Sequence, residues 1–369
     1  MPPECYGVAV DELDAIAARV VGRDPDGARG PWTLELYPTL VCNLSCRFCD
    51  TTLRHQRPVG ELSATRMLEL VDEAAAMGAR RVMVLGGGEP LIAAHTVDVM
   101  RRAKAHGLWG SLTTNGTLLG PSVRAALVEM AWDEVHISID GALARTHDRL
   151  RGHAGAFART VRNVCALRAA RDRVKSGPRL LLHTVLTRDN VDELEGLVHL
   201  AHALGADAVE LDALVAYRPE QEAFALGPEE QARLGDRLRA GIAAATRLGV
   251  RTTYARLLDP GALARGERAP PLPDVPGTTP DFARAPCLKA WHHLTVAADG
   301  HIAACCVLAG EGGSVAETSL STVWQSDPFL QKLRAGMLEG RPTGRCVECS
   351  ENLLAHERAI HARLPVATA

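Results

Sequence analysis

The chain has 369 residues, the length of two domains or of one large α/β unit with an appendage. Hydrophobic residues make up 47% and charged residues 23%, which excludes a disordered chain, a collagen and a coiled-coil rod. The net charge of −3, from 41 basic and 44 acidic residues, is too even to predict a nucleic acid or an anionic membrane as partner. No apolar run is long enough to cross a membrane, and the first residues do not resemble a secretion signal, so the sequence predicts a cytoplasmic protein.

From about residue 33 onward, strand-like and helix-like segments alternate six times. The predicted strands cover 34–41, 81–85, 111–114, 134–139, 179–186 and 208–215, and the predicted helices cover 63–77, 95–106, 120–131, 156–170, 191–204 and 227–248. This alternation predicts a parallel β/α architecture, either an open sheet or a full or partial barrel.

The composition changes after residue 255. Seven of the 21 prolines lie between Pro260 and Pro286, in a stretch with neither helical nor strand periodicity. Beyond it, 294–306 predicts a hairpin that turns at Asp299-Gly300, and a helical stretch follows over 320–337. The predicted organisation is therefore an amino-terminal extension (1–31), a β/α domain (32–255), a proline-rich linker (256–286) and a small cysteine-bearing domain (287–369).

Ten cysteines are unusual for a cytoplasmic chain, in which clustered thiols more often bind metal or take part in catalysis than form disulfides. Cys42, Cys46 and Cys49 follow the first predicted strand, at the end where β/α folds build their active sites. Three thiolates do not complete a tetrahedral zinc site, but they suit a 4Fe-4S cluster that keeps one iron open. The alternatives are a zinc site with a distant fourth ligand, or cysteines that are simply buried.

The carboxy-terminal region holds a second group of thiols. Its members are Cys287, Cys305, Cys306, Cys346 and Cys349. Four of them could bind either zinc or an iron–sulfur cluster, and either Cys305 or Cys306 could serve as a ligand. The remaining one would be a packed thiol or, in the case of Cys306, a hydrogen-atom donor. Cys165, in a predicted helix, is expected to be a core residue.

The segment CNLSCRFC, with Phe48 before its last cysteine, resembles the signature of the radical S-adenosylmethionine (SAM) superfamily. The Gly-Gly-Gly-Glu-Pro run at 86–90 is similar to that family's GGEP element. The resemblance implies a partial (β/α)6 barrel in which SAM binds the open iron of the cluster held by three cysteines. It further implies reductive cleavage of SAM to a 5′-deoxyadenosyl radical, with an external electron donor such as flavodoxin or ferredoxin.

The resemblance also implies a set of residues that contact the cofactor. They are Phe48, Gly87, Gly88, Glu89, Asn115, Ser138 and Arg151. Glu89 and its glycines would lie near the amino group of SAM, Ser138 near the ribose and Arg151 near the carboxylate. Arg149 is the alternative to Arg151, because the spacing here has one more residue than the family pattern.

The carboxy-terminal pattern C-x12-G-x4-C, followed by Trp324 and C-x2-C, resembles the shorter twitch form of the SPASM extension. No cysteine follows Cys349, as expected for that form. The resemblance implies a second, auxiliary 4Fe-4S cluster, held by Cys287, Cys305, Cys346 and Cys349.

The substrate is expected between SAM and the auxiliary cluster. Glu210 and Asp212 stand two residues apart on a predicted strand, so both point to one face, and either could act as a base. A resemblance to 2-deoxy-scyllo-inosamine dehydrogenase-like enzymes favours oxidation of a carbinol on a sugar or aminocyclitol, as in antibiotic biosynthesis. The alternatives are a radical epimerase that uses Cys306 as hydrogen donor, or a peptide (RiPP) maturase. The short predicted extension before the barrel favours the sugar-like substrate.

Overall fold

The computed structural model describes residues 15–17, 20, 30–49, 60–214, 216, 218–258, 287–308, 310–341 and 346. Its strands form one sheet in the order β7-β6-β5-β4-β3-β2-β1-β8-β9. The strands are β1 (Thr33–Leu36), β2 (Arg81–Val84), β3 (Trp109–Thr114), β4 (Glu134–Ser138), β5 (Arg179–Leu186), β6 (Ala208–Ala213), β7 (Arg251–Thr252), β8 (His293–Val296) and β9 (Ile302–Ala303). The longer helices are α2 (Ala64–Ala76), α3 (Thr96–Ala105), α4 (Pro121–Glu129), α5 (Ala144–Arg151), α6 (Ala156–Val174), α7 (Leu194–Leu204), α9 (Pro228–Leu248), α12 (Leu320–Ser326) and α13 (Pro328–Leu338). Shorter helical turns are α8 (Pro219–Glu222) and α11 (Lys289–His292).

The pairing of the strands confirms the predicted α/β fold. β1 to β7 are parallel, and β8 also runs parallel to β1, with Thr33 aligned to both Arg81 and His293. β8 and β9 form the antiparallel hairpin predicted over 294–306. The carboxy-terminal segment therefore extends the sheet of the β/α domain, beside its first strand. The predicted division into four segments remains a prediction, and most of 1–31 and of 256–286 lies outside the described residues.

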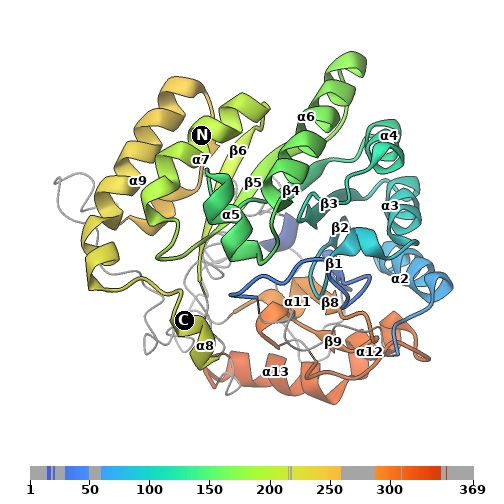
Figure 1. Ribbon diagram of the computed structural model, residues 1–369. Helices are drawn as coiled ribbons and strands as arrows, with labels where there is room; N and C mark the ends of the chain where they lie inside the picture. The colour runs from blue at the N-terminus through green and yellow to red at the C-terminus, as the bar shows by residue number, and fades with distance from the viewer. Residues whose placement is uncertain are drawn as a thin grey trace.

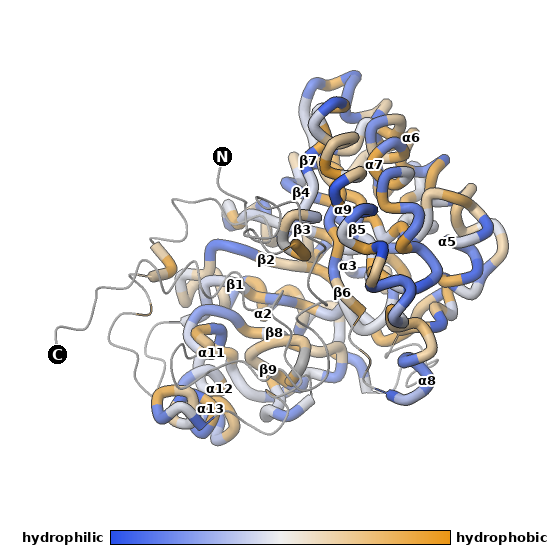
Figure 2. The backbone as a smooth tube through the Cα atoms, turned by 90° about the vertical axis from the view of Figure 1, so that its left-hand side faces the viewer, coloured by the Kyte–Doolittle hydropathy of each residue, from blue (hydrophilic) through white to orange (hydrophobic). Residues whose placement is uncertain are grey.

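The hydrophobic core lies between the sheet and the helices that surround it (Figure 1). Leu34 and Leu36 of β1 are fully buried, as are Met67 and Leu70 of α2. Helix α2 begins after Ser63, which caps the helix because its hydroxyl accepts a hydrogen bond from the amide of Arg66. Orange and blue segments alternate along the outer helices in Figure 2, the pattern of helices with one buried face.

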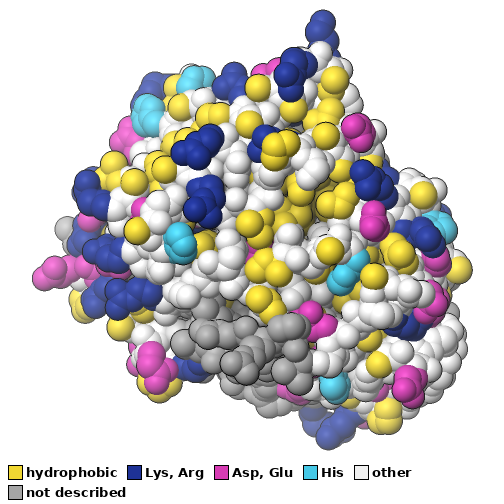
Figure 3. All heavy atoms as spheres, turned by 45° about the vertical axis from the view of Figure 1, so that its right-hand side comes forward, with side chains coloured by type: hydrophobic (Ala, Val, Ile, Leu, Met, Phe, Trp, Pro, Cys, Tyr) yellow, Lys and Arg dark blue, Asp and Glu magenta, His cyan; other side chains and the backbone are white. Residues whose placement is uncertain are grey.

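The surface shows no patch of a single charge on the face drawn in Figure 3. Acidic and basic side chains lie among one another there, while hydrophobic side chains gather near its centre. Among the residues that the structure describes, no helix combines the length and hydrophobicity that crossing a membrane requires.

Several elements differ from the sequence-based prediction, and three of the differences are instructive. The strand predicted over 34–41 ends at Leu36, because Pro38 has no amide hydrogen for the sheet and the chain then turns over the loop after β2. The helix predicted over 320–337 is broken at Asp327, which ends α12 and caps α13 ahead of Pro328. Helix α5 was not predicted, because its sequence is strongly polar.

The inner face of the sheet is polar. His136 on β4 lies between Glu134 on the same strand and Glu210 on β6, at 2.8 and 3.0 Å from their carboxylate oxygens. Burial by itself would lower the pKa of His136, but Glu210 and Glu134 outweigh it and raise the pKa to about 10. The imidazole is therefore a buried cation between two inward-facing carboxylates, and Glu134 also lies 3.4 Å from the guanidinium of Arg179.

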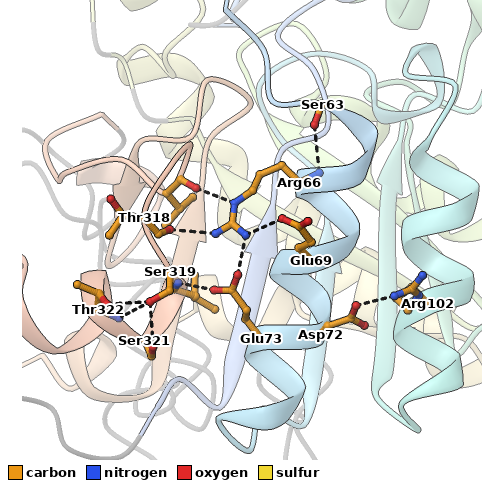
Figure 4. A network of polar contacts seen from close by, with 12 residues as sticks. Ser63, Arg66, Glu69, Asp72, Glu73, Arg102, Thr318, Ser319, Ser321 and Thr322 are labelled. Atoms are coloured by element: carbon orange, nitrogen blue, oxygen red, sulfur yellow. Dashed lines mark hydrogen bonds and ion pairs between the residues drawn. The ribbon is translucent and has the colours of Figure 1, made fainter.

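Arg66 of α2 anchors the carboxy-terminal segment to the β/α domain (Figure 4). Its guanidinium donates to the carbonyl oxygens of Val315 (2.8 Å) and Thr318 (3.0 Å), and forms an ion pair with Glu73 at 2.6 Å. Glu73 in turn accepts a hydrogen bond from the amide of Leu320, the first residue of α12. Since the Arg66 side chain is only 14% exposed, these bonds are well shielded from water.

We expect Arg66→Met to lower the free energy of unfolding by about 2 kcal/mol, because it removes charged hydrogen bonds and leaves Glu73 without its cation. Arg101→Met is the control, because Arg101 pairs only loosely with Asp98, at 3.4 Å, and both side chains are more than half exposed. Arg101→Met is expected to lower the free energy of unfolding by less than about 0.5 kcal/mol. Urea unfolding of the two variants measures the difference, and equal losses would show that the Arg66 contacts do not hold the two parts together.

The stability that His136 contributes is expected to depend on pH. A group whose folded pKa is raised stabilises the fold fully below its unfolded pKa, here 6.5, and loses that contribution as pH rises toward about 10. The stability difference between wild type and His136→Gln should therefore be largest at pH 6.5 and narrow toward pH 10. His199→Gln, at an exposed position on α7, is the control. A difference that stays constant over this range would mean that His136 is not charged in the fold.

Candidate active site

Residues 42–49, which carry Cys42, Cys46 and Cys49, are called the cysteine loop. This loop lies at the carboxyl edge of the sheet, where it meets the loops that follow β2, β3 and β4. One pocket is formed there. It is lined by Cys42, Leu44, Cys46, Cys49, Gly86, Gly87, Gly88, Glu89, Pro90, Thr113, Thr114, Asn115, Ser138 and Arg151. All three amino-terminal cysteines and all the predicted cofactor contacts except Phe48 therefore share one cavity.

The glycines of the loop after β2 are required by a close approach of backbone. A Cβ atom on Gly88 would lie 1.9 Å from the carbonyl oxygen of Val41, and Gly87 has φ +67°. The amides of Gly88 and Glu89 donate to the carbonyls of Thr39 and Val41. The glycine run therefore joins the loop after β2 to the segment that leads into the cysteine loop.

Glu89 is buried and holds the end of β3. Its carboxylate accepts hydrogen bonds from the Thr114 hydroxyl (2.6 Å) and from the amides of Asn115 (2.8 Å) and Leu91 (3.2 Å). Burial raises its pKa, although these bonds act in the opposite direction. Glu89 thus fixes the wall of the pocket that it lines.

The Asn115 side chain links β3 to the cysteine loop. Its amide nitrogen donates to Asn43 at 2.9 Å, and its oxygen accepts from the amide and the hydroxyl of Thr117. Asn43 also donates to Thr117, at 2.8 Å. Asn115 therefore positions the cysteine loop, and its predicted contact with SAM remains a prediction.

Arg151, at the end of α5, is the arginine that reaches the pocket. Its Nη2 lies 2.6 Å from Asp140, and its Nη1 lies 3.8 Å from the sulfur of Cys46. Arg149, the alternative, points elsewhere and pairs with Asp189 at 3.1 Å, half exposed to solvent. Asp140 follows β4, so an ion pair between β4 and α5 places a cation beside the cysteine loop.

Burial changes the protonation of several groups around Arg151. It raises the pKa of the Cys46 thiol to about 12 and, less strongly, that of Cys42. It also lowers the pKa of His147 to about 4, with the Arg151 charge adding to the effect. Cys42 and Cys46 are consequently neutral thiols before they bind iron, and iron has to displace their protons.

These groups fit a cluster that carries an amino-acid ligand. Three thiols face one cavity, and the buried Nε of Arg151 has no hydrogen-bond partner among the described residues. Such a donor suits a carboxylate, and the Glu89 carboxyl suits an amine. Within the described part of the chain, no three His, Cys, Asp or Glu side chains are arranged to hold a single metal ion, and a four-iron cluster spans more space than one ion.

Ser138, at the end of β4, lines this pocket, whereas Phe48 is not among its lining residues. The Phe48 ring lies beside it, with the Arg151 guanidinium 5.8 Å from the ring centroid. The Phe48 carbonyl accepts a hydrogen bond from Gln221 at 2.9 Å.

The structure separates the two carboxylates considered as bases. The carboxylate of Glu210 is paired with the buried His136, at 3.0 Å. Asp212 instead pairs with His183 of β5 at 2.8 Å, where the two side chains are 32% and 23% exposed. His183 is aligned with Ser138 across β4 and β5, so this pair lies next to the strand that lines the pocket.

The carboxy-terminal cysteines differ in burial. Cys287 and Cys305 pack half-buried against the hydrophobic core, Cys346 is buried and Cys306 is exposed. This favours Cys305 over Cys306 as the ligand, while Cys349 lies outside the described residues. Cys165 is exposed, so its prediction as a core residue was wrong, because the buried face of α6 runs through Thr160, Val164 and Leu167.

Several residues of the site were not found from the sequence. Asn43 and Gln221 contact Asn115 and Phe48 from positions distant in sequence. Asp140 pairs with Arg151, and His147 accepts a hydrogen bond from the amide of Asp140. Of these, only Asp140 carried a signal, since it stands in the Ser-Ile-Asp-Gly run at the end of a predicted strand.

Comparison with known proteins agrees with this geometry. Residues 36–201 match the family model of the radical SAM superfamily, and residues 287–350 match an iron–sulfur cluster-binding domain, SPASM. An AdoMet-dependent heme synthase of Methanosarcina barkeri is 33% identical over 53% of this chain and 54% of its own length. A PqqA peptide cyclase of Granulibacter bethesdensis is 28% identical over 83% of this chain and 76% of its own length.

A solved structure with the same fold is that of Streptococcus suis SuiB bound to S-adenosylmethionine. Its TM-score is 0.64 at 16% identity, over 83% of this chain and 68% of that chain. SuiB has also been solved bound to its precursor peptide, SuiA. The match to the M. barkeri relative spans only about half of that protein.

The two matched domains carry a SAM-binding 4Fe-4S cluster, auxiliary iron–sulfur binding and SAM as their cofactors. With the β/α fold and the shared pocket in place, residues 36–201 are a radical SAM domain and residues 287–350 a SPASM-type iron–sulfur domain.

Proposed function

We propose that this chain is a radical SAM enzyme that oxidises a peptide substrate. The observation that carries the catalytic part is that Cys42, Cys46 and Cys49 line one pocket together with Glu89 and Arg151. The peptide part is supported by the match to a PqqA peptide cyclase along most of the chain, and by a fold shared with SuiB. These relatives do not support the sugar or aminocyclitol substrate predicted from the sequence.

The residues present account for how the cofactors would be held. Cys42, Cys46 and Cys49 would bind three irons of the first cluster, and the unpaired Nε–H of Arg151 would bind the carboxylate of SAM. When bound, these groups supply one-electron reductive cleavage of SAM, and thereby a radical that abstracts hydrogen from the substrate. Asp140 fixes the guanidinium in place, and the surrounding buried side chains exclude water. The auxiliary cluster would be held by Cys287, Cys305, Cys346 and Cys349.

The substrate is proposed to lie over the ends of β5 and β6, beside Ser138. Asp212 and His183 are titratable side chains there, with 32% and 23% of their surface exposed. We assign Asp212 to the substrate side, and Glu210 to the internal neutralisation of His136.

The cluster assignment is tested by changing Cys42, Cys46 and Cys49 together to Ala. We expect 5′-deoxyadenosine formation from SAM and dithionite to be abolished, while about four irons per chain remain in the auxiliary cluster. Anaerobic reconstitution, iron quantitation and chromatography of the nucleoside measure both quantities. Continued SAM cleavage by the triple variant would refute the assignment.

The substrate class is tested by adding candidate substrates to the wild-type enzyme. A synthetic peptide copied from a short reading frame beside the gene is expected to stimulate 5′-deoxyadenosine formation and to lose two mass units. An aminocyclitol is the comparison compound. Stimulation by the aminocyclitol alone would refute the peptide proposal and support the sugar or aminocyclitol substrate.

The roles of the two carboxylates are tested by measuring stability and activity in parallel. Glu210→Gln is expected to lower the free energy of unfolding by about 3 kcal/mol, because it leaves a buried cation with only one partner. Asp212 belongs to a more exposed pair, so we expect Asp212→Asn to lower the free energy of unfolding by about 1 kcal/mol or less. The same variant is expected to reduce peptide-dependent turnover. The reverse ordering of the two stability losses would contradict this division of roles.

A further inference from the structure

The cysteine loop is contacted by a segment far away in the sequence. The side-chain nitrogen of Gln221, in α8, donates to the carbonyl oxygen of Phe48 at 2.9 Å, across 173 positions of sequence. Phe48 immediately precedes Cys49, so this bond acts on the backbone that carries one of the three thiols.

The orientation of the Gln221 amide is fixed by its other end. Its Oε1 accepts a hydrogen bond from the amide of Arg218 at 3.0 Å, where the chain enters α8. The side chain is only 1% exposed. With the oxygen occupied by Arg218, the nitrogen is directed at Phe48, and a buried amide satisfied at both ends has little freedom to move.

A second contact joins the same two segments. The guanidinium of Arg47 lies 5.3 Å from the ring centroid of Phe224, two residues beyond α8. On its other side the loop is held by α5, since the amides of Ser45 and Arg47 donate to the carbonyls of Arg151 and Leu150. The cysteine loop is therefore held from α5 on one side and from the segment after β6 on the other.

We propose that Gln221 is a positioning residue for the SAM-binding cluster. By holding the Phe48 carbonyl it fixes the backbone of Cys49, and so the place of that thiol relative to Cys42 and Cys46. The inference rests on the proposed cluster assignment. Because the same segment leaves β6, it also ties the cluster loop to the strand that carries Asp212, at the proposed substrate side.

The test uses two variants of Gln221 and one matched control. Gln221→Met keeps the length of the side chain but donates no hydrogen bond. Gln221→Glu retains the acceptor for Arg218 and turns the contact with Phe48 into a repulsion, so it tests the same bond if the first variant folds poorly. The control is Gln231→Met, since Gln231 makes the same kind of bond, to the carbonyl of Leu226 at 3.1 Å, without touching the cysteine loop.

The readout is the electron paramagnetic resonance spectrum of the dithionite-reduced protein, with and without SAM, together with the rate of iron loss to EDTA. Only the amino-terminal cluster should respond to SAM. We expect both Gln221 variants to alter the SAM-responsive signal and to weaken retention of that cluster by about tenfold or more, the usual effect of losing a group that orients a metal ligand. The control should behave as wild type, and the signal of the auxiliary cluster should be unchanged in all variants.

Two outcomes would overturn the inference in distinguishable ways. If wild type shows a SAM-responsive signal and both Gln221 variants match it and the control, Gln221 does not position the cluster, while the proposed function stands. If wild type itself shows no SAM-responsive signal, the cluster assignment fails and the role of Gln221 falls with it.

Discussion

The parallel alignment of β1 to β4 is the constraint on which the site depends. Because these strands run in one direction, the loops that follow them end at one edge of the sheet, and the cysteine loop, Glu89, Asn115 and Ser138 meet in a single pocket. The loops are then joined to one another by backbone and side-chain bonds, as where Glu89 holds the end of β3. Helix α5 completes the pocket through the ion pair of Arg151 with Asp140.

Much of this arrangement could be predicted from local sequence. The alternation of strands and helices predicted the fold, and the spacing of Cys42, Cys46 and Cys49 on a strand-end loop predicted where the pocket lies. Arg151 could not be chosen over Arg149 from spacing alone, because the choice depends on where α5 packs. The contacts of Gln221 with Phe48 and of Arg66 with Thr318 were also out of reach, since they join segments whose proximity is set only by the complete fold. The pairing of β8 with β1 could not be predicted either, because the hairpin pattern does not indicate which strand of the sheet the hairpin joins.

The inner face of the sheet shows how charge is distributed around the site. His136 lies as a cation between the buried Glu134 and Glu210, whereas Asp212 and His183 pair closer to solvent. Two carboxylates that look equivalent in the sequence therefore occupy different environments. Because of this difference we place the substrate near Asp212. Asp212 lies on β6, and the chain that leaves β6 leads to Gln221, which contacts the cysteine loop. The peptide that we propose as substrate would lie in that region.

The most direct test of the account is to measure metal content and SAM cleavage on the same anaerobically reconstituted wild-type sample. The account predicts about eight irons per chain, in two four-iron clusters with broad visible absorption. It also predicts 5′-deoxyadenosine on addition of SAM and dithionite. A protein that instead binds zinc, shows no visible absorption and leaves SAM intact would contradict it.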